Sequence, residues 1–350
     1  MVNVRLQYID LLKVLSIFAI ISIHVFMVWQ NAEVKNINIY AFSSIVRFGV
    51  PVFVMISGAL LLNRDIEITS FLKKKVRRLV TPFIFYYILT AIVIVGVLNS
   101  THYQIENIFA FRWYFWMIIG VYLSIPIINK FIQNSSMKEI EYFVILFVIA
   151  SIFYQITYYF KIEQYLYLTL FLSPLGYLVL GYYLSRKDFN LNSNSIIIIS
   201  VILFIISTFI KFNGFLGIIP MTDNFIATQS KMLSSWLDVG IFEIIQSSAL
   251  FLICKYVYQS KQGISLIFKN FLQRNHVSQF IESVSKASYG MYLINLIPTF
   301  LCYYLQAFDF TGTQVVLLII SLSLIIFISS WLVIVVFSKI PYIKNVSGYS

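Results

Sequence analysis

Three ionisable side chains near the start of the sequence have types and spacings that could do chemistry. Asp10, Lys13 and His24 all lie in the first apolar segment. In a helix, the eleven residues from Lys13 to His24 make close to three turns, so both side chains share one face roughly 16 Å apart along the axis. An imidazole can take up a proton near neutral pH, an ammonium can hold an anion, and a carboxylate can orient that ammonium.

The composition places this segment in a membrane. The chain has 350 residues, of which 60% are hydrophobic and only 11% are charged, which excludes an ordinary soluble globule. Ionisable groups are costly inside a bilayer, so the Asp10, Lys13 and His24 stripe predicts a functional site. Cys254 and Cys302 both lie in apolar runs, so neither a disulfide framework nor a metal site is expected.

Apolar segments long enough to cross about 30 Å of hydrocarbon as helices recur along the chain. They predict an all-α, polytopic membrane bundle of about ten transmembrane helices, forming a single domain over residues 1–350 with no fused soluble domain. The first segment has no cleavage pattern after it and is expected to be retained. The ten predicted spans are 9–29, 43–62, 79–98, 113–132, 141–160, 165–184, 195–212, 236–258, 288–305 and 314–337.

The distribution of Lys and Arg predicts the orientation of these spans. A basic run at 73–78 joins the second and third spans, and short loops rich in positive charge stay in the cytoplasm. Both termini are then cytoplasmic, and the net charge of +11 mostly faces anionic lipid headgroups or an anionic ligand there. The basic residues are spread over separate loops, so nucleic acid is not an expected partner.

The longest polar connection predicted between two spans covers residues 211–235. It contains two glycines, a proline and an aspartate, which favour a loop. On the predicted topology this segment is an outer loop or lid.

Five segments, taken in order, resemble the landmarks of acyltransferase family 3. The members of that family are multi-spanning bacterial O-acyltransferases that modify cell-surface polysaccharides. The first landmark also includes His24, and the Ser57–Gly58 pair in the second is expected to serve close helix packing. The matching segments are RLQYIDLLK (5–13), RFGVPVFVMISG (47–58), FLKKKVRRLVTP (71–82), WYFWMIIGVYLSIP (113–126) and ASYGMYLI (287–294).

The resemblance implies an acyl transfer across the membrane. A cytosolic acyl-CoA, expected to be acetyl-CoA, would meet a hydroxyl of an extracytoplasmic or lipid-linked cell-envelope glycan. His24, supported by Asp10, would take the hydroxyl proton or form a covalent acyl-histidine, and these two routes stay open. Four basic residues are expected to hold the coenzyme A phosphates, namely Lys13, Lys75, Arg77 and Arg78. Four others are expected to bind substrate, namely Arg47, Arg112, Trp113 and Asn295.

The sequence departs from the family pattern at three places. Lys13 stands where the family usually has arginine, and an ammonium cannot reproduce the two-pronged guanidinium contact. A histidine common just before the fourth-span tryptophan is missing, with Phe111 and Arg112 in that neighbourhood. Asn295 stands where a histidine often follows the ninth-span motif. His24 is therefore the sole imidazole inside a predicted span, and proton transfer is expected to depend on it.

Other functions stay open from the sequence alone. The ionisable stripe could be the proton relay of a transporter or flippase for a polysaccharide precursor. A scaffold subunit that has lost catalysis is a third alternative, in which His24 would be dispensable. The lipid bilayer is the expected partner, with a homo-oligomer or a separate extracytoplasmic protein as further candidates. The expected location is the bacterial cytoplasmic membrane, multi-pass.

Overall fold

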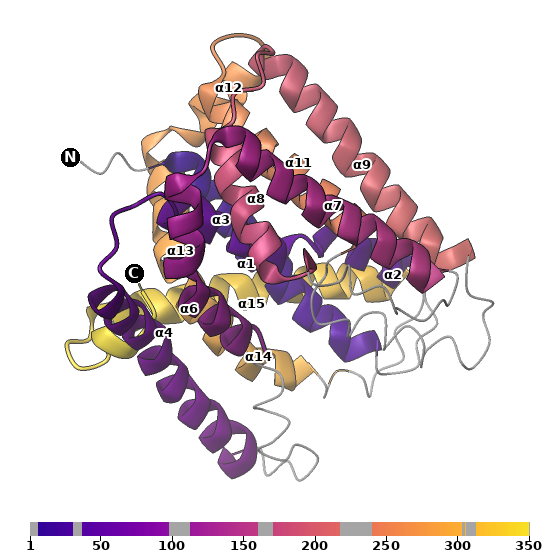
Figure 1. Cartoon of the computed structure of the whole chain (residues 1–350). Helices are drawn as coiled ribbons and strands as arrows, with labels where there is room; N and C mark the ends of the chain where they lie inside the picture. The colour runs from indigo at the N-terminus through magenta and orange to yellow at the C-terminus, as the bar shows by residue number, and fades with distance from the viewer. Residues whose placement is uncertain are drawn as a thin grey trace. The chain divides into compact units, whose positions relative to one another are not determined.

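The computed structural model describes residues 6–30, 37–97, 113–159, 171–217, 240–302, 305 and 313–349. Within these residues the regular structure is helical throughout, as predicted (Figure 1). The α-helices are α1 (Gln7–Gln30), α2 (Ile37–Val46), α3 (Gly49–Leu61), α4 (Ile68–Ala91), α6 (Trp113–Asn134), α7 (Met137–Tyr159), α8 (Pro174–Arg186), α9 (Ser193–Gly217), α11 (Ile241–Gln259), α12 (Ile264–Leu272), α13 (Asn275–Ile294), α14 (Leu296–Leu301) and α15 (Thr313–Lys339). A π-helix, η1 (Ile92–Val97), continues α4, and a 3-10 turn, η4 (Lys344–Val346), follows α15.

Seven helical stretches of the described chain are long and apolar enough to cross a membrane. They coincide with seven of the ten predicted spans and make the chain a multi-pass membrane protein. The other three predicted spans coincide in part with α4 and η1, with α8, and with α13 and α14. The count of ten and the cytoplasmic termini therefore stay predictions. The seven stretches are 7–29, 41–61, 113–134, 137–156, 193–212, 241–259 and 314–339.

The chain forms two compact units, which are described separately. Unit 1 consists of residues 1–12, 47–64 and 127–278, and unit 2 of residues 13–46, 65–126 and 279–350.

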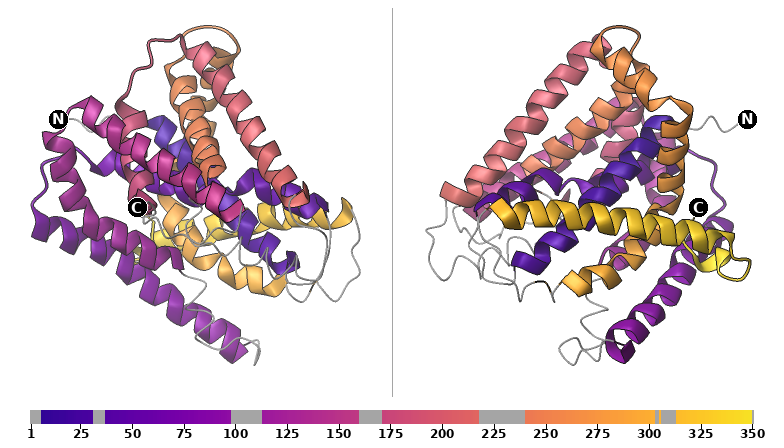
Figure 2. Two further views of the ribbon diagram at one scale, coloured as in Figure 1. Left: turned by 45° about the vertical axis from the view of Figure 1, so that its right-hand side comes forward. Right: turned by 180° about the vertical axis from the view of Figure 1, so that it is seen from behind.

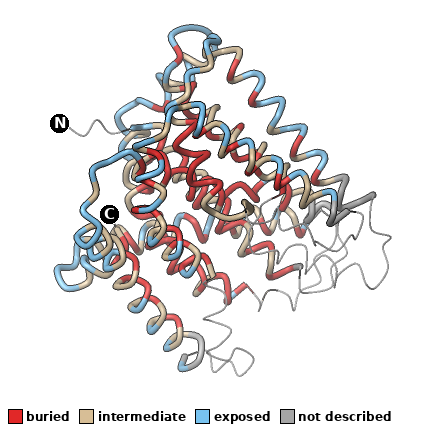
Figure 3. The backbone as a smooth tube through the Cα atoms, in the orientation of Figure 1, coloured by how far each residue is buried: buried red, intermediate tan, exposed pale blue. Residues whose placement is uncertain are grey.

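Unit 1 is built on two helix pairs, α3 with α8 and α9 with α11, whose members lie side by side (Figures 1 and 2). Every residue of α8 from 176 to 184 is buried (Figure 3). In contrast, α9 exposes a broad apolar face, as expected of a helix in contact with lipid.

Glycines allow the backbones of α3 and α8 to touch. A Cβ atom added to Gly58 would lie 1.8 Å from the carbonyl oxygen of Leu178, and one added to Gly181 would lie 2.0 Å from that of Met55. Small residues at such crossings are typical of membrane helices. The neighbouring Ser57 hydroxyl donates to the carbonyl of Phe53 within its own helix, at 3.1 Å. The close approach at Gly58 confirms the helix packing predicted there, whereas the printed hydrogen bond of Ser57 stays within α3.

Unit 2 joins most of α1 with α2, α4, the start of α6, α13, α14 and α15. Hydroxyl groups tie its segments together, because Tyr86 donates to the carbonyl of Ser347 (3.0 Å) and Tyr289 donates to that of Leu79 (2.7 Å). Phe18 of α1 packs edge-on against Phe327 of α15, with ring centroids 5.6 Å apart. The Tyr86–Ser347 hydrogen bond fixes the segment after α15 to α4.

The first prediction concerns the α3–α8 contact. Gly58→Ala should lower the thermal unfolding midpoint of the purified protein, because the added methyl group overlaps a backbone carbonyl and overpacking costs about 1–3 kcal/mol. Gly120→Ala in α6 is the control, since a Cβ there meets no atom within 4 Å. Tryptophan fluorescence during heating in detergent measures both variants. Equal midpoints for the two would show that the close approach does not stabilise unit 1.

Candidate functional site

A single continuous helix, α1, carries Asp10, Lys13 and His24, as their spacing in the sequence predicted. The helix contains neither glycine nor proline, so its backbone hydrogen bonds run without a break. Asp10 is buried, with 8% of its surface exposed, whereas Lys13 and His24 are partly exposed. The imidazole is thus neither sealed from its surroundings nor on an open surface.

Asn295 lies directly against His24. The Nδ1 atom of His24 and the Oδ1 atom of Asn295 are 2.7 Å apart, and Asn295 is fully buried. The Asn295 side-chain nitrogen donates to two backbone carbonyls, that of Met291 at 3.0 Å and that of Tyr292 at 2.7 Å. The backbone at the end of α13 therefore positions the Asn295 amide, and this amide positions the His24 imidazole.

These hydrogen bonds determine the tautomer of His24. The reverse orientation of the Asn295 amide would set its oxygen against two carbonyl oxygens, so the orientation is fixed. An amide oxygen can only accept, so the Nδ1 atom of His24 must carry hydrogen and donate. In the neutral imidazole the Nε2 atom then carries the lone pair that can accept a proton, the same division of roles that a catalytic triad imposes on its histidine.

Tyrosines of α13 and α6 form an aromatic group beside His24. The ring of Tyr292 in α13 lies 6.4 Å from that of His24, and the buried Tyr114 of α6 packs edge-on against Tyr292 at 5.0 Å. Tyr289 stacks on Tyr292 at 6.5 Å. These tyrosines were not expected as site residues from the sequence. Their three-residue spacing with Asn295, at 289, 292 and 295, was the signal that they share a helix face.

The basic residues expected to hold coenzyme A lie in a helix, so placing the basic run in a loop was wrong. Lys75, Arg77 and Arg78 belong to α4, which begins at Ile68. The Glu67 carboxylate caps this helix, and hydrogen bonds from the side chain and backbone of Ser70 lower its pKa to about 2. The two arginines are exposed, whereas Lys75 is partly buried.

The structure describes three of the four residues that are expected to bind substrate. Asn295 contacts His24 in unit 2, whereas Arg47 is buried in unit 1, with 8% of its surface exposed. Trp113 is the first residue of α6, partly exposed, with its ring edge-on to that of Tyr114. Arg112 lies outside the described residues.

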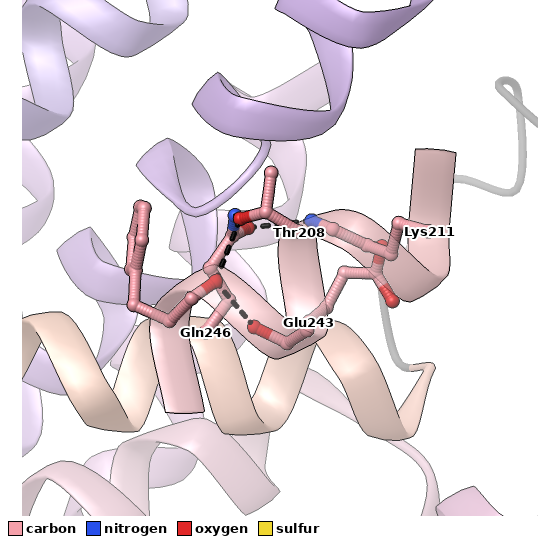
Figure 4. Close-up of polar contacts among 6 residues, drawn as sticks. Thr208, Lys211, Glu243 and Gln246 are labelled. Atoms are coloured by element: carbon pink, nitrogen blue, oxygen red, sulfur yellow. Dashed lines mark hydrogen bonds and ion pairs between the residues drawn. The ribbon is translucent and has the colours of Figure 1, made fainter. Parts of the chain in front are cut away.

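A buried polar cluster in unit 1 was not expected from the sequence (Figure 4). The Lys211 ammonium of α9 donates to the Gln246 amide oxygen at 2.5 Å and lies 3.6 Å from the Glu243 carboxylate, both on α11. The Gln246 amide nitrogen donates to the Thr208 hydroxyl at 2.7 Å. The side chains of Lys211 and Glu243 are 5% and 15% exposed.

The structure differs from the predicted outer loop over the first residues of that segment. Residues 211–217 of the predicted 211–235 connection continue α9 as helix, and the rest of the connection up to residue 235 lies outside the described residues. The helix can continue through Lys211 because Glu243 compensates its charge and Gln246 accepts its hydrogen bond. The sequence spacing could not reveal these two partners.

A comparison with known families identifies the chain over almost its whole length. The sequence model of a family described as an acyltransferase domain matches residues 6–335. No curated protein and no solved structure matches the chain. The matched range includes every residue of the candidate site.

The second prediction concerns the Lys211–Glu243 pair. Lys211→Met should destabilise the protein by about 3–5 kcal/mol, because it leaves a carboxylate buried without its cation. Adding Glu243→Gln should restore most of the loss, because no buried charge is then uncompensated. The thermal midpoint in detergent measures each variant.

The matched control is the more exposed pair formed by Lys187 and Glu141, 3.2 Å apart and 29% and 38% exposed. Lys187→Met should cost no more than about 1 kcal/mol. A Lys211→Met variant that unfolds no earlier than Lys187→Met would contradict a stabilising role for the buried pair.

Proposed function

The chain belongs to acyltransferase family 3. We propose that it moves an acyl group from cytosolic acyl-CoA to a hydroxyl group, and that this acyl group is acetyl. The proposed acceptor is an extracytoplasmic or lipid-linked glycan of the cell envelope. The observation that carries this proposal is the contact between His24 and Asn295, because it assigns the imidazole hydrogen to Nδ1 and gives Nε2 the lone pair of a base.

The proposed reaction is a direct transfer. The Nε2 atom of His24 takes the proton of the acceptor hydroxyl as that oxygen attacks the thioester carbonyl. The new carbon–oxygen bond forms, the carbon–sulfur bond breaks, and the coenzyme A thiolate leaves with the proton held by His24. Throughout, the Nδ1–H group donates to Asn295, which stabilises the imidazolium while it exists. Attack by Nε2 itself, giving an acyl-histidine, uses the same nitrogen.

The proposed donor site is cationic. Arg77 and Arg78 are exposed on the first turns of α4, where their guanidinium groups suit the phosphates of coenzyme A. Lys75 and Lys13 are proposed to complete this site, with the buried Asp10 orienting Lys13 one turn away.

The proposed acceptor site is aromatic. Tyrosine and tryptophan rings offer apolar faces and a polar edge, a combination that suits sugar rings. Trp113, Tyr114 and Tyr292 supply such rings in unit 2. Arg112, which precedes Trp113 in the sequence, is proposed as a further acceptor contact. Arg47 is proposed as a separate substrate-binding residue of unit 1.

Membership of an acyltransferase family favours this enzyme over the transporter or flippase, since neither needs a thioester. The proposed location is the bacterial cytoplasmic membrane. The acceptor is either modified by this chain alone, as a monomer or homo-oligomer, or reached through a separate extracytoplasmic protein.

The third prediction tests the base. His24→Ala should abolish consumption of labelled acetyl-CoA by membranes containing the protein, with an unchanged amount of folded protein. His276→Ala is the control, because His276 is exposed at the start of α13 and should be dispensable. Mass spectrometry of envelope glycans from cells that express each variant identifies the acceptor. Full activity of His24→Ala would remove the proposed mechanism.

The fourth prediction tests Asn295 as a positioning residue. Asn295→Ala removes the acceptor for Nδ1–H, and a hydrogen bond to a charged group contributes about 1.5–3 kcal/mol. The rate constant kcat should therefore fall by about ten- to a hundredfold, while KM for acyl-CoA changes little.

Thr299→Val is the matched control for Asn295→Ala. The Thr299 hydroxyl donates to the backbone carbonyl of Asn295 at 2.8 Å, so this change disturbs the same buried turn without removing the amide. Its kcat should stay near that of the unmodified protein. Equal losses of kcat in both variants would assign Asn295 a purely structural role.

A further inference from the structure

The short helix α12 exposes a continuous apolar face. Ile264, Ile267, Phe268 and Phe271 are 86%, 70%, 48% and 46% exposed. Their spacing of three, four and seven residues from Ile264 puts all four on one side of the helix. Leu272, at the end of α12, is buried instead. Such a face needs an apolar environment that the described part of the chain does not supply here.

The other side of α12 is held to unit 1 by polar contacts. Ser265 bonds to the side chains of Asn194 and Ser260, and Asn194 also donates to the carbonyl of Gln262 at 3.4 Å. The Lys269 ammonium donates to the carbonyl of Ser260 at 3.1 Å. These bonds fix α12 to the end of α11 and the start of α9, so the outward direction of its apolar face is built into the fold.

The position of α12 along the chain puts it at a membrane–water boundary. The candidate span in α11 ends at Gln259, five residues before α12 begins, and the α9 span begins at Ser193, beside Asn194. With nine residues α12 is only about 14 Å long, too short to cross the hydrocarbon. A helix of this kind lies along the interface rather than through the bilayer.

The charged residues nearest to α12 in the sequence are all basic. Lys261 and Arg274 flank the helix and are exposed, and the Arg274 guanidinium lies 5.7 Å from the ring centre of Phe271. The sequence has no acidic residue between Glu243 and Glu282. An apolar face bordered by cations is complementary to a leaflet that contains anionic lipid.

We propose that α12 is an interfacial helix that inserts its apolar face into one leaflet, where Lys261, Lys269 and Arg274 bind the phosphates of anionic lipid headgroups. On the predicted topology this is the cytoplasmic leaflet. The proposal does not depend on acyl transfer.

The first experiment measures the depth of the apolar face. A spin label at Ile267→Cys in nanodiscs should be accessible to oxygen and shielded from a water-soluble nickel complex. The matched control is a label at Gln273→Cys, an exposed polar position at the end of the same helix, which should be accessible to the nickel complex. Cys254 and Cys302 are replaced by alanine in both proteins. Equal nickel accessibility at 267 and 273 would overturn the insertion of α12.

The second experiment tests the lipid charge. The full-length protein should unfold at a higher temperature in nanodiscs with 30% phosphatidylglycerol than in pure phosphatidylcholine. Lys261→Gln with Arg274→Gln should remove at least half of this difference, since each basic residue near a surface is worth about fivefold in affinity. Lys269 is left intact because it also bonds Ser260.

Two controls separate the outcomes. Lys130→Gln with Lys138→Gln removes the same charge from exposed positions on α6 and α7, and should remove less of the lipid-dependent difference. Inorganic phosphate added to phosphatidylcholine nanodiscs should not reproduce the stabilisation. An equal effect of both charge pairs, or stabilisation by free phosphate alone, would overturn a headgroup site at α12.

Discussion

Polar groups in a lipid-embedded helix have to find their partners inside the protein, because hydrocarbon supplies none. His24 meets the amide of Asn295, and Lys211 meets the carboxylate of Glu243 and the amide of Gln246. Each arrangement joins two different segments of the chain. The same bonds that make these groups tolerable in the membrane also hold them in one orientation, so positioning for chemistry needs no additional contacts.

The His24 site illustrates how this constraint gives chemical specificity. An amide that donates twice to backbone carbonyls has only its oxygen left, and that oxygen dictates which imidazole nitrogen carries hydrogen. A histidine at 295, as the family often has, could reverse its own tautomer and would not impose this order as firmly. Asparagine at position 295 is therefore compatible with the acyl transfer that we propose, and in that proposed reaction it concentrates proton transfer on Nε2 of His24.

The outward surfaces of the helices, in contrast to these polar groups, are apolar and need no hydrogen-bond partner. The outward faces of α9 and α12 are both rich in isoleucine and phenylalanine. The proposed insertion of α12 places these two faces at different depths of the bilayer. The α9 helix is long enough to cross the hydrocarbon, and its buried side is a polar seam against α11. The short α12 helix has basic residues at its edges, which suits headgroups rather than acyl chains alone.

The sequence by itself determined the class, the all-helical fold, most of the spans and the family, because length, hydropathy and motif order are local properties of the chain. It also predicted that Asp10, Lys13 and His24 share one helix. Only the tertiary structure decided that Asn295 orients His24 and that Lys211, inside α9, pairs with Glu243. The physical reason is that a side chain's hydrogen-bond partner depends on which helices pack together, and periodicity within one helix carries no information about the face that a distant helix presents.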